Sequence, residues 1–310
     1  MRRRTKESKS GSLLCAVAAI AAFAALALFG CDPNIRLGAA AVDADQNGAT
    51  DAPARIDVSE SNTKANADEE PMDAAEPVDG LGTVMWSASF ETGDFSEYFG
   101  DNDDEVQQGC QITVNGTMTV SAEQAHSGTH SAKISISSAN GAGPYVYLYR
   151  NCANSPNVMP DAYYGAWLYI PIAYHVGNYW NLVHFIVSPN RDRFGSSYAW
   201  DVDLQSDDAG DLTLYVFDFI HQRRTDQPNP IAVQPGQWFH LEVFLHLASD
   251  TTGRLVVWQN GRLIIDAQNL MTSATQFIQW AFGSASSDIT PSPADLYIDD
   301  VTVSTARVGP

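Results

Sequence analysis

The sequence predicts an all-β domain, an antiparallel β-sandwich of the jelly-roll kind, over residues 83–310. Short segments of this region alternate apolar and polar residues with the period of two that a half-buried strand requires. No long run after the first thirty residues has helical periodicity. All seven Trp and all seven His lie after residue 82, so one domain holds enough aromatic side chains for a sizeable core.

The first thirty residues have the composition of a bacterial export signal. An apolar run at residues 13–29 follows a basic head, which consists of Arg2, Arg3, Arg4, Lys6 and Lys9. Residues 28–31, LFGC, resemble the lipobox of bacterial lipoproteins, which implies that Cys31 carries a lipid and anchors the chain to a membrane. An uncleaved transmembrane anchor is the alternative. Both interpretations place the domain in the cell envelope, outside the cytoplasm, in the periplasm or on the surface.

Residues 31–82 predict a disordered acidic tether between the anchor and the domain. From residue 32 onward they contain no aromatic residue, and twelve Asp or Glu stand against three Lys or Arg. Such a segment buries too little apolar surface to offset its chain entropy.

Four cysteines occur in the chain, and two of them fall within the domain. Cys15 leaves with the signal and Cys31 takes the lipid, so Cys110 and Cys152 remain as an even pair in an oxidising compartment. We expect a disulfide between them; two unrelated buried thiols are the alternative.

Alternation assigns the faces of the early strands. GPYVYLYRN places Tyr145, Tyr147 and Tyr149 on one face. NYWNLVHFIVS places four residues together, namely Trp180, Leu182, His184 and Ile186. YAWDVDLQ separates an apolar face from an acidic one; the apolar face is Tyr198, Trp200, Val202 and Leu204, and the other is Asp201, Asp203 and Gln205.

Alternation continues in the later strands. WFHLEVFLHL directs its apolar face inward and leaves Trp238, His240 and Glu242 on the other face. Residues 253–266, GRLVVWQNGRLIID, predict a hairpin that turns at Asn260-Gly261, because such a turn needs positive φ at both residues.

The predicted hairpin is apolar on both faces. A two-residue turn pairs Trp258 with Leu263 and Val256 with Ile265 on one face. The other face pairs Val257 with Ile264, and Leu255 with Asp266. Both faces therefore need cover, and we expect further protein rather than a ligand on Trp258.

These strands carry a resemblance to a known superfamily. PGQWFHLEVFLHLASDTTGRLVVWQNGRLIID, with SFETGDFSEY near the start of the domain and DLYIDDVTVS near its end, resembles the concanavalin A-like lectin and glucanase superfamily. This superfamily includes laminin G-like domains and polysaccharide lyases, and the resemblance covers about residues 86–304. It implies a jelly roll with one curved sheet and a sugar-binding concave side. A shared fold does not fix an activity.

A sugar-binding surface combines aromatic rings that stack on sugars with polar side chains that bond hydroxyls. We expect such a surface to be formed by Tyr145, Tyr147, Trp180, His184, Trp238, His240 and Glu242. The alternative is that the tyrosines belong to the core and that the histidines are ordinary surface residues.

Two enzyme classes of the superfamily can be compared with the sequence. Its glucanases carry a Glu-x-Asp-x-x-Glu strand, but residues 201–205 have no glutamate at either end, which argues against a hydrolase. Its alginate lyases carry Gln-x-His and Tyr-x-Lys strands. His184 matches that histidine, but Leu182 stands at the glutamine position and no Tyr-x-Lys occurs. A lyase would then use Tyr147 and His184 as catalytic residues, with Arg150.

Charge narrows the choice of partner. Residues 83–310 hold 24 Asp or Glu against nine Lys or Arg, so the domain repels nucleic acid and acidic polymers unless a basic patch overcomes the field. The candidate basic clusters are Arg191 with Arg193, and Arg223 with Arg224. We therefore expect a neutral glycan as the ligand and no nucleic-acid partner.

A structural calcium ion is the one cofactor that we expect. In the jelly rolls that this chain resembles, carboxylates of the first and last strands share such an ion, and Glu91 with Asp299 or Asp300 occupies matching places. A solvated acidic strand end is the alternative.

The sequence therefore favours a cell-envelope lipoprotein whose β-sandwich binds a neutral glycan without catalysis. Two alternatives stay open: a polysaccharide lyase that acts by β-elimination, and a structural or adhesive envelope protein with a protein partner.

Overall fold

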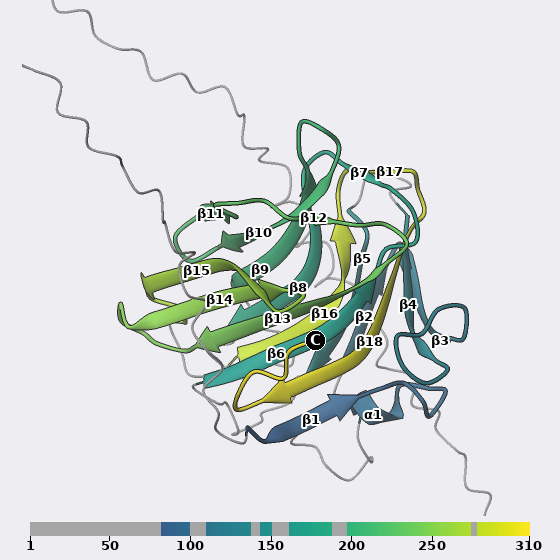
Figure 1. Cartoon of the computed structure of the whole chain (residues 1–310), viewed down its shortest axis with the longest axis horizontal. Coiled ribbons are helices and arrows are strands. Elements are labelled where there is room, and N and C mark those ends of the chain that lie inside the picture. Colours follow the sequence, from purple (N-terminus) through teal and green to yellow (C-terminus); the bar gives the residue numbers. More distant parts are fainter. Residues whose placement is uncertain (1–81, 100–109, 138–142, 151–160, 188–196, 274–277) are drawn as a thin grey trace, which may run out of the picture. The chain divides into compact units, whose positions relative to one another are not determined.

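The computed structural model describes residues 82–99, 110–137, 143–150, 161–187, 197–273 and 278–310 (Figure 1). The signal, the tether, Cys31 and Cys152 lie outside these ranges. Lipidation of Cys31 and a disulfide between Cys110 and Cys152 therefore stay predictions. In the described ranges, no helix has the length and apolar character needed to span a membrane.

The described chain consists of strands and one short helix, α1 (Ser96–Phe99). The strands in the first half are β1 (Val84–Ala88), β2 (Cys110–Val114), β3 (Gly116–Ser121), β4 (Ser131–Ile136), β5 (Tyr145–Arg150), β6 (Asp161–Tyr169), β7 (His175–Val176), β8 (Trp180–Val187) and β9 (Ser197–Ser206). The later strands are β10 (Leu212–Asp218), β11 (Arg223–Asp226), β12 (Ala232–Val233), β13 (Trp238–His246), β14 (Gly253–Gln259), β15 (Arg262–Leu270), β16 (Ile278–Ser286), β17 (Ile289–Thr290) and β18 (Ala294–Ser304).

Two large antiparallel sheets form the layers of the domain (Figure 1). One, called here the β13 sheet, has the order β15-β14-β13-β6-β18-β4-β3, with β1 beside β18. The other, the β8 sheet, has the order β11-β10-β9-β8-β16-β5-β2, with β12 beside β10. Strands β7 and β17 pair separately. The predicted antiparallel β-sandwich is confirmed.

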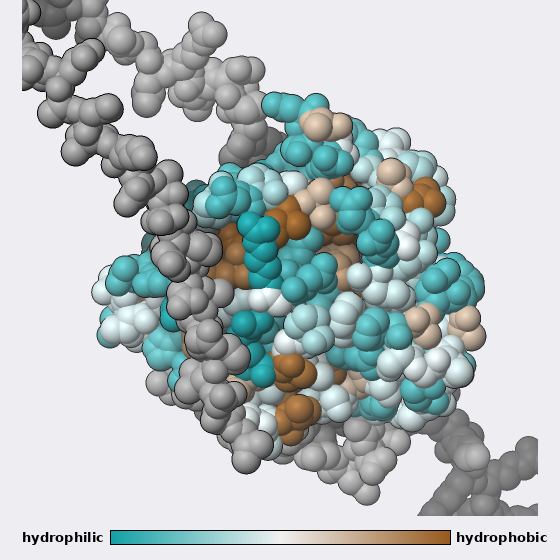
Figure 2. All heavy atoms as spheres, in the orientation of Figure 1, coloured by the Kyte–Doolittle hydropathy of each residue, from teal (hydrophilic) through white to brown (hydrophobic). Residues whose placement is uncertain are grey.

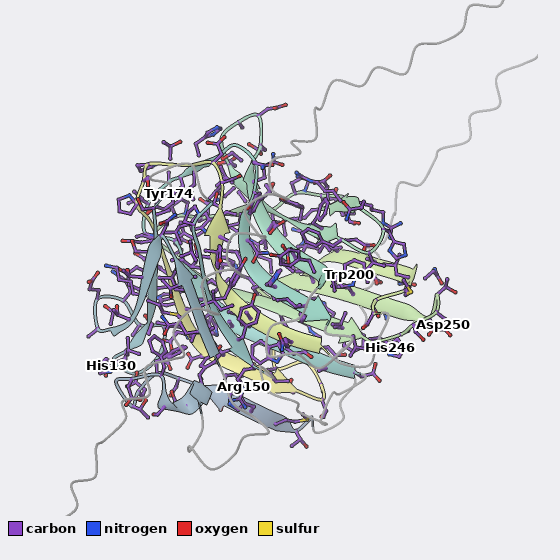
Figure 3. All side chains as sticks on the ribbon, turned by 180° about the vertical axis from the view of Figure 1, so that it is seen from behind. His130, Arg150, Tyr174, Trp200, His246 and Asp250 are labelled. Atoms are coloured by element: carbon purple, nitrogen blue, oxygen red, sulfur yellow. The ribbon has the colours of Figure 1, made fainter. Side chains whose placement is uncertain are left out.

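The inner faces of both sheets share one hydrophobic core. Leu241, Val243 and Leu245 of β13 meet Trp200 and Val202 of β9 within this core, and each is at most 1% exposed. Trp200 lies inside the sandwich, whereas His246 and Asp250 lie at its edge (Figure 3). On the face drawn in Figure 2, hydrophobic residues reach the surface only as small patches among hydrophilic ones.

The hairpin of β14 and β15 turns at Asn260-Gly261, where both residues have the positive φ that was expected, 50° and 77°. Trp258 faces Leu263 as predicted, but the rest of the register is shifted by one. A bulge between Val257 and Trp258 pairs Val257 with Ile265, Val256 with Asp266 and Leu255 with Ala267, so the predicted pairs of these three residues are wrong. The extra residue in β15 turns Asp266 outward.

The outer face of this hairpin is covered by the end of the chain. The Arg307 guanidinium lies 4.5 Å from the centre of the Trp258 ring, and Tyr163 packs on the same tryptophan. The predicted cover by further protein is thus present on Trp258.

Candidate functional site

A β-bulge in β8 decides which side chains reach the outer face of the β8 sheet. Asn181 pairs with Asp203, but the next paired residue is Val183, opposite Val202. Leu182 is therefore an extra residue, and the alternation shifts by one. Trp180 and Leu182 are buried in the core, and the indole of Trp180 donates to Ser284 Oγ at 2.7 Å.

This shift corrects two predictions. Trp180 and Leu182 do not share a face with His184 and Ile186, and Trp180 is not available to a sugar in this structure because it is fully buried. Asn181 takes the place beside His184 instead. The amide that the sequence lacked at position 182 is thus supplied one residue earlier.

His184 lies in the middle of this outer face, with its side chain 3% exposed. Its Nδ1 makes a short hydrogen bond to the Asp201 carboxylate. Because a carboxylate only accepts, Nδ1 carries a proton, and in the neutral imidazole the lone pair is then on Nε2. The Nε2 atom is buried and has no hydrogen-bond partner in the described structure.

Tyrosine rings surround His184. Tyr147 stacks on the imidazole with ring centres 5.1 Å apart, Tyr198 lies at 4.9 Å and Tyr149 at 6.1 Å. Tyr147 and Tyr149 are buried. Tyr198 is 54% exposed, and Tyr145, at the end of the stripe, is 37% exposed. The predicted stripe of Tyr145, Tyr147 and Tyr149 therefore shares this face.

A chain of hydrogen bonds leads from Tyr147 to Asp203. The Tyr147 hydroxyl donates to Asn181 Oδ1 at 2.9 Å, and Asn181 Nδ2 donates to Asp203 Oδ1 at 2.9 Å. Burial raises the pKa of Tyr147 well above its usual value, and the Asp201 carboxylate adds to this effect. Burial and Asp201 also raise the pKa of Asp203, so the neutral forms of both groups are favoured.

The only cation described on this face lies at the far end of β9. Arg224 stacks over the Tyr215 ring at 3.7 Å and hydrogen-bonds to Gln205. Asp201, Asp203 and Gln205 share the outer face as predicted. Tyr198 does not share a face with Trp200, since a second irregularity interrupts the pairing of β8 with β9.

Arg150 lies on the opposite side of the β8 sheet from Tyr147 and His184. It donates from Nη1 to the Tyr98 carbonyl at 2.6 Å, and its guanidinium lies 4.7 Å from the Trp86 ring centre. The predicted grouping of Arg150 with Tyr147 and His184 is wrong, because neighbouring residues of β5 alternate across the sheet.

Trp238, His240 and Glu242 face outward on the other sheet. His240 is 3% exposed beside the Trp167 ring, and burial lowers its pKa. Glu242 is 1% exposed and accepts from Arg307 Nε at 2.9 Å and from the Val308 amide at 2.8 Å. The single surface that the sequence predicted is therefore divided between two sheets.

The three carboxylates of the predicted calcium site all contact the loop at residues 126–130. Glu91 accepts from the backbone amides of Thr129 and His130, at 2.8 and 2.7 Å. Asp299 accepts from the His126 amide at 2.8 Å, and Asp300 from the same histidine ring at 2.7 Å. In the described ranges, no three His, Cys, Asp or Glu side chains are grouped to hold a metal ion. Calcium binding stays a prediction.

The outer face of the β8 sheet holds a set of groups suited to proton transfer. Asp201 fixes an imidazole whose other nitrogen is unpaired, and a protonated phenol lies against that imidazole. Asn181 was missed in the sequence because no residue pattern marks a bulge. The spacing of Asp201 and Asp203 predicted that both share one face, but it did not indicate that Asp201 bonds His184.

Comparison with known proteins agrees with this architecture. A family model described as polysaccharide lyase matches residues 90–302. An endo-β-1,4-glucuronan lyase from the fungus Trichoderma reesei is similar in structure, with a TM-score of 0.52 and 15% identity over 72% of this chain and 96% of that one. An alginate lyase from Aplysia kurodai has a TM-score of 0.46 and 14% identity, over 74% of this chain and 100% of that one. No curated protein matches the sequence.

Proposed function

The chain belongs to the polysaccharide lyase family, and from this premise we propose that it cleaves a uronic-acid polymer by β-elimination at His184. One observation carries the proposal: the buried, unpaired Nε2 of His184, held by Asp201 and stacked on Tyr147. An orphaned acceptor in a buried site is costly, which supports a role in chemistry. The sequence favours a non-catalytic domain partly because Leu182 stands at the glutamine position, and the position of Asn181 beside His184 removes that objection.

The proposed reaction uses a base and an acid. His184 Nε2 removes the proton from the carbon next to the uronate carboxyl, and Asp201 stabilises the imidazolium that forms. The electron pair forms a carbon–carbon double bond as the glycosidic carbon–oxygen bond breaks. Tyr147 gives its proton to the leaving oxygen, and the proton on His184 returns to the tyrosine through solvent before the next turnover.

Substrate access in this proposal depends on Tyr198. Of the rings against His184, Tyr147 and Tyr149 are buried within the sheet, whereas Tyr198 is more than half exposed. Movement of this ring uncovers Nε2. The exposed Tyr145 and Tyr198 rings then provide stacking surfaces for the sugars on each side of the cleaved bond.

The acidic balance of the domain must be overcome locally for a uronate to bind. The raised pKa of Asp203 favours its neutral form, and Asp201 is paired with His184. Arg224 lies on the same face, where its charge is balanced by the Asp226 carboxylate at 2.6 Å. The local charge is thus less negative than the composition of the domain suggests.

Incubation of the full chain with a panel of uronic-acid polymers tests the proposal. β-Elimination leaves an unsaturated sugar that absorbs ultraviolet light, so absorbance should rise with at least one polymer. His184→Ala should lower the rate by about 10²- to 10⁴-fold. His246→Ala, a half-buried histidine at the edge of the other sheet, is the matched control and should retain the rate. Glycan binding without any product would instead support the non-catalytic reading.

We also propose that the domain works in the cell envelope, held by a lipid on Cys31. Metabolic labelling with a fatty acid should mark the native chain and not Cys31→Ser. Labelling that persists in this variant would contradict the proposal.

A further inference from the structure

The proposed base and the proposed acid come from the same face of one sheet. His184 belongs to β8 and Tyr147 to β5, and β16 lies between these two strands. Gly283 of β16 pairs with Tyr147, and a Cβ atom at this glycine would collide with Tyr147 Cδ1 and with the Val146 carbonyl. The Tyr147 ring therefore lies close over the backbone of β16, where only a glycine leaves room for it.

The hydroxyl of Tyr147 is held on the strand that carries His184. It donates to Asn181 Oδ1 at 2.9 Å, and Asn181 is a residue of β8 that is 1% exposed. The Asn181 amide is fixed in turn, because its Nδ2 donates to Asp203 Oδ1 at 2.9 Å. The acid and the base are thus neighbours on the floor of the site, and neither projects over the other from the solvent side.

A sugar ring does not fit between these two side chains. The rings of Tyr147 and His184 are inclined by only 20°, and their centres are 5.1 Å apart. A sugar between two such rings would need van der Waals contact on both sides, at about 3.5 to 4 Å each, and hence a separation of about 7 to 8 Å. The substrate must therefore lie above both groups, which reach it from the same side.

The side from which the two groups act selects the configuration of the sugar. In β-elimination the base takes the hydrogen on C5, next to the carboxyl, and the acid protonates the oxygen on C4. In 1,4-linked D-glucuronate and D-mannuronate, this hydrogen and this oxygen lie on the same side of the sugar ring. In L-guluronate, L-iduronate and D-galacturonate they lie on opposite sides. A base and an acid on one side are within hydrogen-bonding reach of both atoms only in the first group.

We infer that the site acts by syn elimination on 1,4-linked polymers of D-glucuronate or D-mannuronate, and not on the uronates with the opposite arrangement. The inference rests on the proposed elimination at His184 and names its substrate class. His184 Nε2 takes the C5 hydrogen as a proton, and the electron pair of that bond forms the double bond between C4 and C5. The bond from C4 to its oxygen breaks, and Tyr147 protonates this oxygen from the same side.

Tyr198 supplies the competing arrangement. Its ring is 54% exposed and lies 4.9 Å from His184 at an inclination of 58°. A sugar held between Tyr198 and His184 would meet a base from below and a phenol from above, which suits the opposite configuration. The structure favours Tyr147, because its hydroxyl is fixed by Asn181, whereas Tyr198 must move before a sugar reaches Nε2.

Polymannuronate and polyguluronate test the inference as a matched pair, since their sugars differ only in configuration at C5. Both give the same unsaturated sugar, because C4 and C5 become planar, so ultraviolet absorbance compares the two rates directly. The full chain is also incubated with polyglucuronate and polygalacturonate. At least one of polymannuronate and polyglucuronate should be cleaved, about a hundredfold or more faster than polyguluronate and polygalacturonate.

Variants assign the acid, and the outcomes separate this inference from the proposed function. Tyr147→Phe should slow cleavage of the favoured polymer by about 10²- to 10⁴-fold, whereas His246→Ala, on the other sheet, should keep both the rate and the preference. Equal or faster cleavage of polyguluronate or polygalacturonate overturns the inference and leaves elimination at His184 intact. Loss of cleavage in Tyr198→Phe but not in Tyr147→Phe overturns it as well. No cleavage of any of the four polymers overturns both proposals.

Discussion

Glu242 of the β13 sheet and His184 of the β8 sheet are both buried on the outer face of their sheet, but they differ in how their polar atoms are satisfied. On the β13 sheet, Glu242 is buried, and both of its carboxylate oxygens accept hydrogen bonds from the end of the chain. On the β8 sheet, His184 is equally buried, but its Nε2 is left without a partner in the described structure. Strand alternation creates both positions. This difference indicates that a buried polar group whose hydrogen bonds are made by its own chain stabilises the fold. A buried polar atom without a partner points instead to a ligand or a reaction.

Substitution of Tyr147 should have the largest effect on activity. Tyr147→Phe keeps the ring that stacks on His184 and removes the proton donor, so we expect kcat to fall by about 10²- to 10⁴-fold. Steady-state kinetics on a cleaved uronic-acid polymer measure this. Tyr145→Phe removes the hydroxyl of an exposed tyrosine on the same strand and should leave kcat unchanged. An equal loss in both variants would contradict the role of Tyr147.

Substitution of Glu242, on the outer face of the β13 sheet, should change the stability of the protein and not its activity. Glu242→Ala leaves Arg307 and the amides of residues 308 and 309 without their acceptor, and we expect the free energy of unfolding to fall by about 2 to 3 kcal/mol. Urea denaturation measures the loss. Asp161→Ala removes an exposed partner of His246 and should cost less than about 1 kcal/mol. A loss of kcat in Glu242→Ala without a loss of stability would contradict the stabilising role of Glu242.

Tyr198 tests how substrate reaches His184. Tyr198→Ala removes an exposed stacking surface while it leaves Nε2, Asp201 and Tyr147 in place, so KM should rise about three- to tenfold and kcat should stay within about threefold. Initial rates over a range of polymer concentrations separate the two constants. A fall in kcat as large as that of Tyr147→Phe would show that Tyr198 takes part in the chemistry.

The smallest expected effect is a pH dependence at Asp299. Burial raises the pKa of Asp299 to about 6, and the neighbouring Asp300 carboxylate adds to this against the hydrogen bond from the His126 amide. Since this pKa lies above that of an unfolded aspartate, the group stabilises the native state fully below about pH 4 and loses this contribution as the pH rises through about 6.

Asp299→Asn should remove this pH dependence. Melting temperatures at pH 4 and pH 7 measure it, and the difference between them should shrink in the variant. Asp208→Asn, at an exposed loop position, should retain the native difference. An unchanged difference in Asp299→Asn would contradict the raised pKa.

Much of this architecture follows from alternation alone. The period of two correctly assigned the faces of β5 and β13, most of β9 and the turn at Asn260-Gly261, because each depends on local backbone geometry. It failed at Trp180 and Val256, where a bulge inserts one residue and reverses every later assignment. It also could not show that Glu242 meets Arg307, since a contact across 65 positions leaves no local pattern.

The central claim, elimination at His184, is tested most directly by the origin of the oxygen in the product. Cleavage of a uronic-acid polymer is run briefly in water enriched in heavy oxygen, and the new reducing ends are reduced at once with borohydride, before the anomeric oxygen exchanges with water. The new chain ends are then examined by mass spectrometry. β-Elimination breaks the bond without adding water, so we predict an unsaturated end and no heavy oxygen in either fragment. Heavy oxygen at the new ends would show hydrolysis, and glycan binding without cleavage across the panel would show a binding domain; either result contradicts the claim.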